Sequence, residues 1–191
     1  MLVPGRLLGK HRLERLHSTV MERRVVGVIS DTHGLLRPEA VAALASVDLI
    51  VHAGDIGSAA VLDELGTIAP VLAVRGNNDR GPWAASVPET VTTEVGGLRL
   101  YVIHDLKTLP KNPADLGVDV IISGHSHKPK VERRSGVLML NPGSAGPRRF
   151  SLPIALARLC VDATGPSAEI VELAPPGGLD GAKVRGAVSP P

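Results

Sequence analysis

Side chains that commonly bind divalent metal ions follow several hydrophobic runs of this 191-residue sequence. They are four histidines, two aspartates and one asparagine, namely Asp31, His33, Asp55, Asn77, His104, His125 and His127. Imidazole and carboxylate ligands together suit divalent Mn, Fe, Ni or Zn. Seven ligands exceed what one tetrahedral ion uses, and they match two ions that share a bridging carboxylate. Because two neighbouring cations repel each other, an anion must lie between them, and Asp55 is the candidate bridge.

The spacing of these residues predicts how they reach a common point. Asp31 and His33 are two positions apart, as are His125 and His127, so each pair would point the same way from an extended segment. A glycine precedes three of the ligands, and we expect each to let the backbone turn sharply. These glycines are Gly54, Gly76 and Gly124.

The first half of the chain alternates between predicted strands and helices. Residues 25–30, 48–52 and 71–75 are short apolar runs, typical of strands buried on both faces. Helical stretches at 38–46 and 59–65 separate them, and the first begins at a proline. This β-α-β-α-β order predicts a parallel sheet with helix crossovers. Ligands bind at the carboxyl ends of strands in such sheets, where the polar clusters lie.

The pattern changes after residue 90. Turn signals at 96–97 and 135–136, each flanked by apolar runs, predict two hairpins. Residues 154–162 and 168–173 predict a third hairpin, and 118–123 another buried strand. We therefore expect antiparallel β structure in this half. Two sheets packed face to face, with helices outside, would satisfy both halves of this α/β chain.

Taken in order, these clusters resemble the motifs of the calcineurin-like metallophosphoesterases, and most closely those of the small prokaryotic phosphodiesterases. The resemblance covers about residues 25–165, and the segment 141–144 (NPGS) belongs to it. It implies a four-layer α/β/β/α fold built on a two-sheet β-sandwich flanked by helices. It also implies that Asp55 bridges two ions, one held by Asp31, His33 and His127, the other by Asn77, His104 and His125.

Two positions depart from the family pattern. Asn78 stands where many members have a histidine that assists at the phosphate; small phosphodiesterases often carry a cysteine there. An amide donates a hydrogen bond but cannot act as a general acid near pH 7, so we expect slower hydrolysis of esters with basic leaving groups. Asp105 stands where many relatives have a glycine followed by a second histidine.

The function that this resemblance implies is metal-dependent hydrolysis of phosphodiesters. A hydroxide bridging the two ions would attack phosphorus, with Asp55 and Asn78 as the catalytic residues. Asn78, Arg75 and Arg148 are candidate phosphate contacts, since guanidinium and amide groups donate to phosphate oxygens. Manganese is our first choice of metal, with nickel, iron or zinc as alternatives.

Two alternatives stay open at this point. One is a phosphomonoesterase or nucleotide pyrophosphatase, because two bridged ions serve monoesters and diesters equally. The other is a non-catalytic metal-binding scaffold resembling the retromer subunit of this family. An intact set of seven ligands favours catalysis over the scaffold, whereas Asn78 points the other way.

Composition limits the classes of binding partner and the cellular location that we expect. Residues 1–24 hold six basic and two acidic side chains, whereas the rest of the chain holds 15 basic and 17 acidic ones. Because the body of the chain is net acidic, we predict no nucleic-acid partner. The small phosphoester substrate that we predict is implied by the family resemblance. No apolar run reaches the roughly 18 residues of a membrane helix. The single cysteine, Cys160, fits a reducing compartment, so we expect the cytoplasm. Relatives often form dimers or larger assemblies, so a homo-oligomer is an option.

The ends of the chain differ from its centre. We expect a flexible basic extension over residues 1–24, with Met1 or Met21 as the natural start. The metallophosphoesterase domain would span residues 25–174. Residues 175–191 are rich in proline and glycine, which predicts an unstructured tail.

Overall fold

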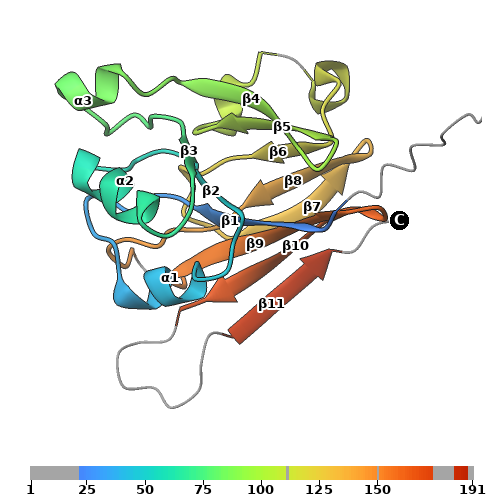
Figure 1. Ribbon diagram of the computed structural model, residues 1–191. Helices are drawn as coiled ribbons and strands as arrows, with labels where there is room; N and C mark the ends of the chain where they lie inside the picture. The colour runs from blue at the N-terminus through green and yellow to red at the C-terminus, as the bar shows by residue number, and fades with distance from the viewer. Residues whose placement is uncertain (1–21, 111, 150, 174–182, 189–191) are drawn as a thin grey trace, which may run out of the picture.

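The computed structural model describes residues 22–110, 112–149, 151–173 and 183–188. Its first sheet has six strands in the order β11-β10-β9-β1-β2-β3 (Figure 1). The strands are β1 (Arg24–Ile29), β2 (Leu49–His52), β3 (Val71–Ala73), β9 (Ala155–Asp162), β10 (Gly165–Glu172) and β11 (Lys183–Val188).

Helices connect the parallel part of this sheet. β1 pairs with β2 and β2 with β3, all in parallel register. Helix α1 (Pro38–Ala43) joins the first pair and begins at Pro38, and α2 (Ala59–Gly66) joins the second pair. A short helix, α3 (Pro82–Ala85), follows β3. The predicted β-α-β-α-β unit is confirmed.

The second sheet has the strand order β4-β5-β6-β8-β7. Its strands are β4 (Thr90–Val95), β5 (Leu98–Ile103), β6 (Val120–Ile122), β7 (Lys130–Arg134) and β8 (Val137–Asn141). The three predicted hairpins form, as β4–β5, β7–β8 and β9–β10. Entirely antiparallel structure was a wrong prediction, because β6 pairs in parallel with both β5 and β8. Two 3₁₀ helices, η1 (Leu106–Thr108) and η2 (Pro113–Leu116), supply the crossover from β5 to β6.

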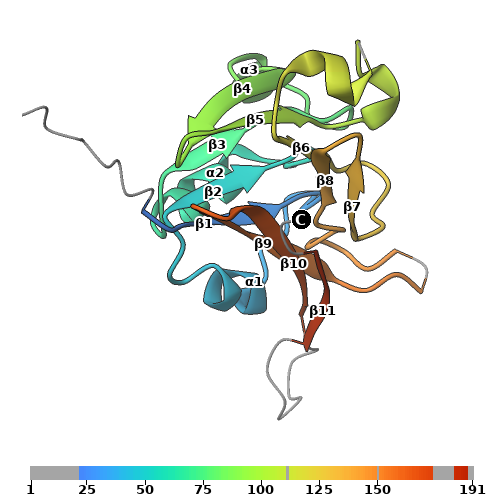
Figure 2. The same ribbon diagram turned by 90° about the vertical axis from the view of Figure 1, so that its right-hand side faces the viewer.

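The two sheets pack face to face around one apolar core (Figure 2). Val26 and Val28 of β1 lie in this core with Leu100 of β5 and Leu138 of β8, all fully buried. α1 and α2 cover the outer face of the first sheet, where Leu44 and Leu65 pack with Ile29. The segment containing η1 and η2 covers the second sheet. The predicted α/β fold, a two-sheet sandwich in four layers, is confirmed.

The structure changes one prediction about the ends of the chain. Within the predicted unstructured tail, residues 183–188 instead form β11, which pairs antiparallel with β10. The exposed edge of β10 offers unpaired backbone groups, and a strand there satisfies them. Most of the basic extension, residues 1–21, lies outside the described residues, as do 174–182 and 189–191. Among the described helices, none is long and apolar enough to cross a membrane.

Candidate metal centre

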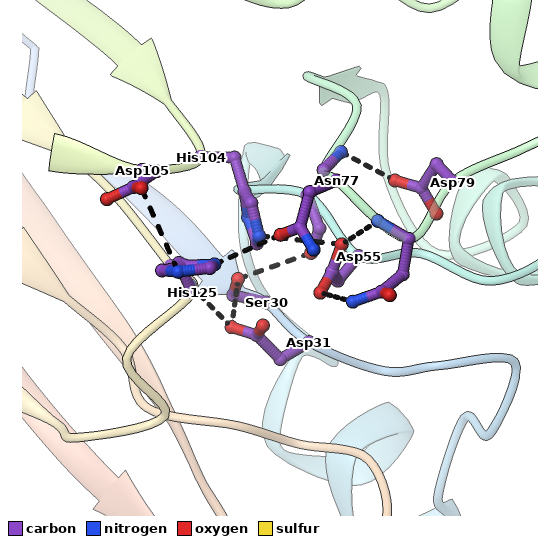
Figure 3. Close-up of polar contacts among 12 residues, drawn as sticks. Ser30, Asp31, Asp55, Asn77, Asp79, His104, Asp105 and His125 are labelled. Carbon is purple, nitrogen blue, oxygen red and sulfur yellow. Dashed lines mark hydrogen bonds and ion pairs between the residues drawn. The ribbon is translucent and has the colours of Figure 1, made fainter. Parts of the chain in front are cut away.

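The loops that follow β1, β2, β3, β5 and β6 meet at one edge of the sandwich (Figure 3). Each loop carries one or two of the seven predicted ligands. Parallel pairing places the ends of β1, β2 and β3 together, and the parallel pair β5–β6 does the same for His104 and His125. The predicted residues are therefore brought together by the strand order of both sheets.

Asp31, His33 and His127 form a first ligand group. His127 Nε2 lies 3.2 Å from Asp31 Oδ1. The rings of His33 and His127 stack with their centroids 5.5 Å apart. One ligand atom from each of the three lies within 4.8 Å of the others, a spacing suited to a single metal ion.

Asp55 lies between this group and the next. Its Oδ2 is 3.8 Å from His33 Nε2, and its Oδ1 is 3.4 Å from His104 Nε2. One carboxylate thus faces a histidine of each predicted group. Asp31 also reaches both sides, since it forms a second compact cluster with Asp55 and His104.

Asn77, His104 and His125 lie on the other side of Asp55. His125 Nδ1 is 3.0 Å from Asn77 Oδ1, and the rings of His104 and His125 meet edge to face at 5.2 Å. His104 Nδ1 lies 2.7 Å from the carbonyl oxygen of Ala53. A carbonyl only accepts, so this nitrogen carries the hydrogen and Nε2 keeps a lone pair facing Asp55.

Unpartnered polar atoms show that these residues fit metal ions. Asp31 Oδ1, His33 Nε2 and His104 Nε2 are buried and make no hydrogen bond. Buried polar groups normally have a partner, because an unsatisfied one costs about 1–3 kcal/mol. All three atoms belong to predicted ligands and lie in the clusters just described. A cation would satisfy these atoms together.

The backbone of the ligand loops differs from the predicted extended form. Asp31, His33, Asp55, His125 and His127 all have left-handed φ angles, between 48° and 65°. The extended prediction for the two ligand pairs was therefore wrong. Non-glycine residues adopt this conformation at a cost, and such residues cluster at functional sites. Here it coils each loop, so that Asp31 and His33 face the same ligand group, whereas His127 faces that group and His125 faces the other.

The glycines before the ligands act in two different ways. Gly54 has a φ of 92°, which confirms a sharp turn before Asp55. Gly76 and Gly124 have no such angle, and the structure shows that they provide space instead. A Cβ at Gly76 would overlap Asp55 Oδ1, and one at Gly124 would overlap Ser30 Oγ. The strand ends approach so closely that no side chain fits between them.

The site is strongly electronegative. Burial raises the pKa of Asp55, but the neighbouring His104 ring and hydrogen bonds from Asn78 outweigh it and hold this pKa well below its usual range. Burial lowers the pKa of His104, but the Asp55 carboxylate and the Ala53 carbonyl outweigh it and raise this pKa. The carboxylate is thus ionised and attracts positive charge, as a cation site requires.

Neighbouring residues hold the ligand loops in place. Asp79 accepts hydrogen bonds from the backbone N–H groups of Gly76 and Gly57, so it braces the turn as its position suggested. The Ser144 hydroxyl of the NPGS segment donates to the carbonyl oxygen of Asp31 at 3.0 Å. His52 lies fully buried beneath Asp55, 2.9 Å from Thr32 Oγ1.

The three residues predicted to contact the substrate lie in different surroundings. The side chain of Asn78 donates to Asp55 Oδ2, and Arg75 pairs with Glu89 in a cavity beside the second ligand group. Arg148 is exposed and makes no described contact with the ligands. Sequence reasoning missed its neighbour Arg149. Burial lowers the pKa of His33, and the positive charge of nearby Arg149 acts in the same direction.

Comparison with known proteins agrees with this arrangement. The calcineurin-like phosphoesterase superfamily domain matches residues 25–164. The chain belongs to the calcineurin-like phosphoesterase superfamily. This family membership confirms the resemblance predicted from the motifs, and it supports the coarser function, a metal-dependent phosphoester hydrolase.

Two relatives and one solved structure show the same likeness. A protein of Methanothermobacter thermautotrophicus named "Probable metallophosphoesterase" is 38% identical over 164 residues, covering 80% of this chain and 94% of its own. A phosphodiesterase of Methanocaldococcus jannaschii is 28% identical, covering 62% and 82%. The structure of vacuolar protein sorting 29 from Cryptosporidium parvum superposes with a TM-score of 0.72 at 22% identity, covering 87% and 98%. At that identity the last likeness shows the fold alone.

Proposed function

We propose that this protein is a phosphodiesterase that uses two divalent metal ions. The observation that carries the two-ion assignment is the position of Asp55, whose two oxygens face His33 and His104 separately. Two cations would lower the pKa of an attacking water and offset the charge that develops on the phosphoryl oxygens. Asp31, His33 and His127 would hold one ion, and Asn77, His104 and His125 the other, with Asp55 shared.

The residues around the ions have supporting roles in this proposal. Asn78 orients Asp55 through its side-chain amide and offers a donor on the exposed side of the centre. Arg149 adds positive charge near His33, where a phosphoryl oxygen would be attracted. Both arginines are exposed, but only Arg149 acts on the charge of His33, so we propose Arg149 ahead of Arg148 as the phosphate contact.

The preference for diesters is supported by a cavity of about 570 Å³ beside the second ligand group. A diester carries two organic groups on phosphorus, and this cavity offers room for one of them against Tyr101 and Ile103. A monoester also carries more negative charge near neutral pH. Among the lining residues, the cation Arg75 is already paired with Glu89, and Asp105 adds a negative charge. This lining favours an uncharged organic group over a second anionic oxygen.

The test is hydrolysis of two chromogenic esters by protein stripped with chelator and reloaded with Mn²⁺. We expect bis-p-nitrophenyl phosphate to be hydrolysed faster than p-nitrophenyl phosphate, with no turnover before reloading. Tyr101→Ala should raise KM for the diester more than for the monoester. Faster monoester turnover would instead favour the phosphomonoesterase alternative.

A second candidate function is favoured by Asn78. Because an amide supplies no proton to the leaving oxygen, the site suits substrates whose leaving group is already acidic. A phosphoanhydride has such a leaving group, so nucleotide pyrophosphate hydrolysis is the alternative enzyme activity. Release of nucleoside monophosphate from nucleoside diphosphate derivatives, measured beside diester turnover, separates the two.

The scaffold alternative gains no advantage from the likeness to vacuolar protein sorting 29, which shows the fold alone. A protein that binds two ions and hydrolyses none of these esters would favour the scaffold. The choice of manganese, the cytoplasmic location and a homo-oligomeric state stay predictions.

A further inference from the structure

Asp105 faces a predicted metal ligand that is otherwise weakly held. Its Oδ2 lies 3.8 Å from His125 Nε2 (Figure 3). Asp105 is not among the seven predicted ligands. It directly follows His104, at the end of β5.

The Asp105 side chain is fixed by the start of η1. Its Oδ1 accepts a hydrogen bond from the backbone N–H of Lys107 at 3.0 Å. Its own carbonyl accepts from the backbone N–H of Thr108 at 3.1 Å and from the Thr108 hydroxyl at 2.8 Å. With the backbone and one oxygen held, the other oxygen is directed at His125.

His125 is the most exposed of the four histidines among the predicted ligands. Its side chain is 39% exposed, whereas that of His104 is 5% exposed. Cavities of about 570 Å³ and 340 Å³ are both lined by His125 and Asp105. Packing therefore supports the His125 ring far less than it supports His104, which also has the Ala53 carbonyl on its second nitrogen.

The two nitrogens of His125 have different surroundings. Nδ1 lies 3.0 Å from Asn77 Oδ1, in the second ligand group, and Nε2 faces Asp105. An amide oxygen only accepts, so Nδ1 carries a hydrogen in this contact and must give it up when a cation binds there. A nitrogen that binds a cation must present a lone pair, so the hydrogen of the neutral ring must sit on the other nitrogen. A carboxylate beside that N–H favours this tautomer, which leaves Nδ1 free for the cation. At 3.8 Å the carboxylate acts through its charge rather than through a short hydrogen bond.

We propose that Asp105 is a positioning residue that holds His125 with Nδ1 toward Asn77 and so strengthens binding of the second ion. This inference rests on the proposed two-ion centre. It assigns a role to a position where the sequence departs from its family. The acidic side chain supports the site instead of disturbing it.

The test measures metal binding and needs no turnover. Stripped full-length protein is titrated with Mn²⁺ by calorimetry, as wild type and as Asp105→Asn. The amide keeps the size of the side chain and an oxygen for Lys107, but removes the charge. We expect one of the two binding events to weaken by about 10–100-fold and the other to stay unchanged. Asp63→Asn, which removes an exposed charge on α2, is the matched control and should bind as wild type.

A second readout separates positioning from general structural support. Long-range ¹H–¹⁵N spectra of the protein loaded with diamagnetic Zn²⁺ report which nitrogen of His125 carries the hydrogen. We expect the Nε2–H form in wild type and a mixture in Asp105→Asn, with the metal-free Tm unchanged. Wild-type binding of both ions by Asp105→Asn would overturn the inference, as would an Nδ1–H ring in the wild type.

The outcomes also distinguish this inference from the proposed function. Suppose that wild type binds two ions, that Asp105→Asn binds one of them more weakly, and that wild type hydrolyses no ester. The proposed function then fails and the inference stands. If wild type hydrolyses the diester and Asp105→Asn binds both ions normally, only the inference fails.

Discussion

The side-chain amide of Asn78 donates a hydrogen bond to Asp55 Oδ2 at 2.6 Å. The backbone N–H of Asn78 donates to Asp55 Oδ1 at 2.9 Å. One residue therefore contacts both oxygens of the carboxylate that lies between the two ligand groups. Asn78 can orient this carboxylate, but its amide has no proton to release near neutral pH.

The absence of an acid at Asn78 predicts a strong dependence on the leaving group. Across a series of aryl phosphodiesters, the wild-type kcat/KM should fall steeply as the pKa of the departing phenol rises. Asn78→His should flatten this dependence and raise the rate for the most basic phenol by at least about 10-fold, because a positioned imidazole can protonate the leaving oxygen. If log kcat/KM falls with the phenol pKa at the same slope in wild type and in Asn78→His, the inference that the leaving oxygen lacks an acid in wild type is contradicted.

Asp55→Asn should remove the shared anion while keeping the shape of the side chain. Because two cations need that charge between them, we expect the Mn²⁺ bound per chain to fall from two to one or none. Diester turnover should fall by more than about 100-fold, since even indirect partners of metal ligands contribute up to that much. Metal analysis and turnover are measured beside Asp63→Asn, which should match wild type. Two ions bound to Asp55→Asn would refute the bridging role.

Gly76→Ala tests the close approach of the β3 loop to Asp55. The added Cβ would overlap Asp55 Oδ1, so we expect displacement of this carboxylate, weaker Mn²⁺ binding and a lower Tm. Gly66→Ala is the matched control, because a Cβ there meets nothing within 4 Å. It should leave metal binding unchanged and shift stability by less than about 1 kcal/mol. Equal effects of the two substitutions would show that space at Gly76 is unimportant.

His52 predicts a pH dependence of stability. Burial lowers the pKa of His52 to about 4. Its Nδ1 accepts from the Gly54 N–H at 3.2 Å, so a second proton would place two donors face to face. The unfolded chain binds this proton near pH 6.5 and the folded chain near pH 4. The contribution of His52 to the free energy of unfolding is therefore fully present above pH 6.5. It is lost as the pH decreases from 6.5 through 4, and the total loss is about 3 kcal/mol.

Chemical denaturation of the metal-free protein at pH 7.5 and pH 4.5 measures this loss. The raised pKa of His104 acts in the opposite direction, so the comparison is made with His52→Gln, which does not titrate. We expect a smaller loss in His52→Gln than in wild type, although this variant is less stable at pH 7.5. An equal loss in both proteins would contradict the role of His52.

Local pattern accounts for most of the elements but not for how strands pair. The alternation of apolar runs with turn residues located β1 to β10, α1 and α2 to within a few residues, but not α3 or the two 3₁₀ helices. Pairing depends on crossovers, and the short 3₁₀ segments between β5 and β6 carry no strong periodic signal. That is why antiparallel structure was expected where β6 pairs in parallel on both sides. β11 was missed because its strand depends on the edge that β10 provides.

The sequence by itself determined which residues are candidate metal ligands, because residue type and order specify chemistry directly. Tertiary structure decided the rest of the centre. Three features of the centre depend on loops from both sheets. They are the left-handed backbone at Asp31 and His125, the space left by Gly76, and the approach of Asp105 to His125. Such contacts join residues far apart in the chain, so only the packing of the two sheets sets their distances and orientations.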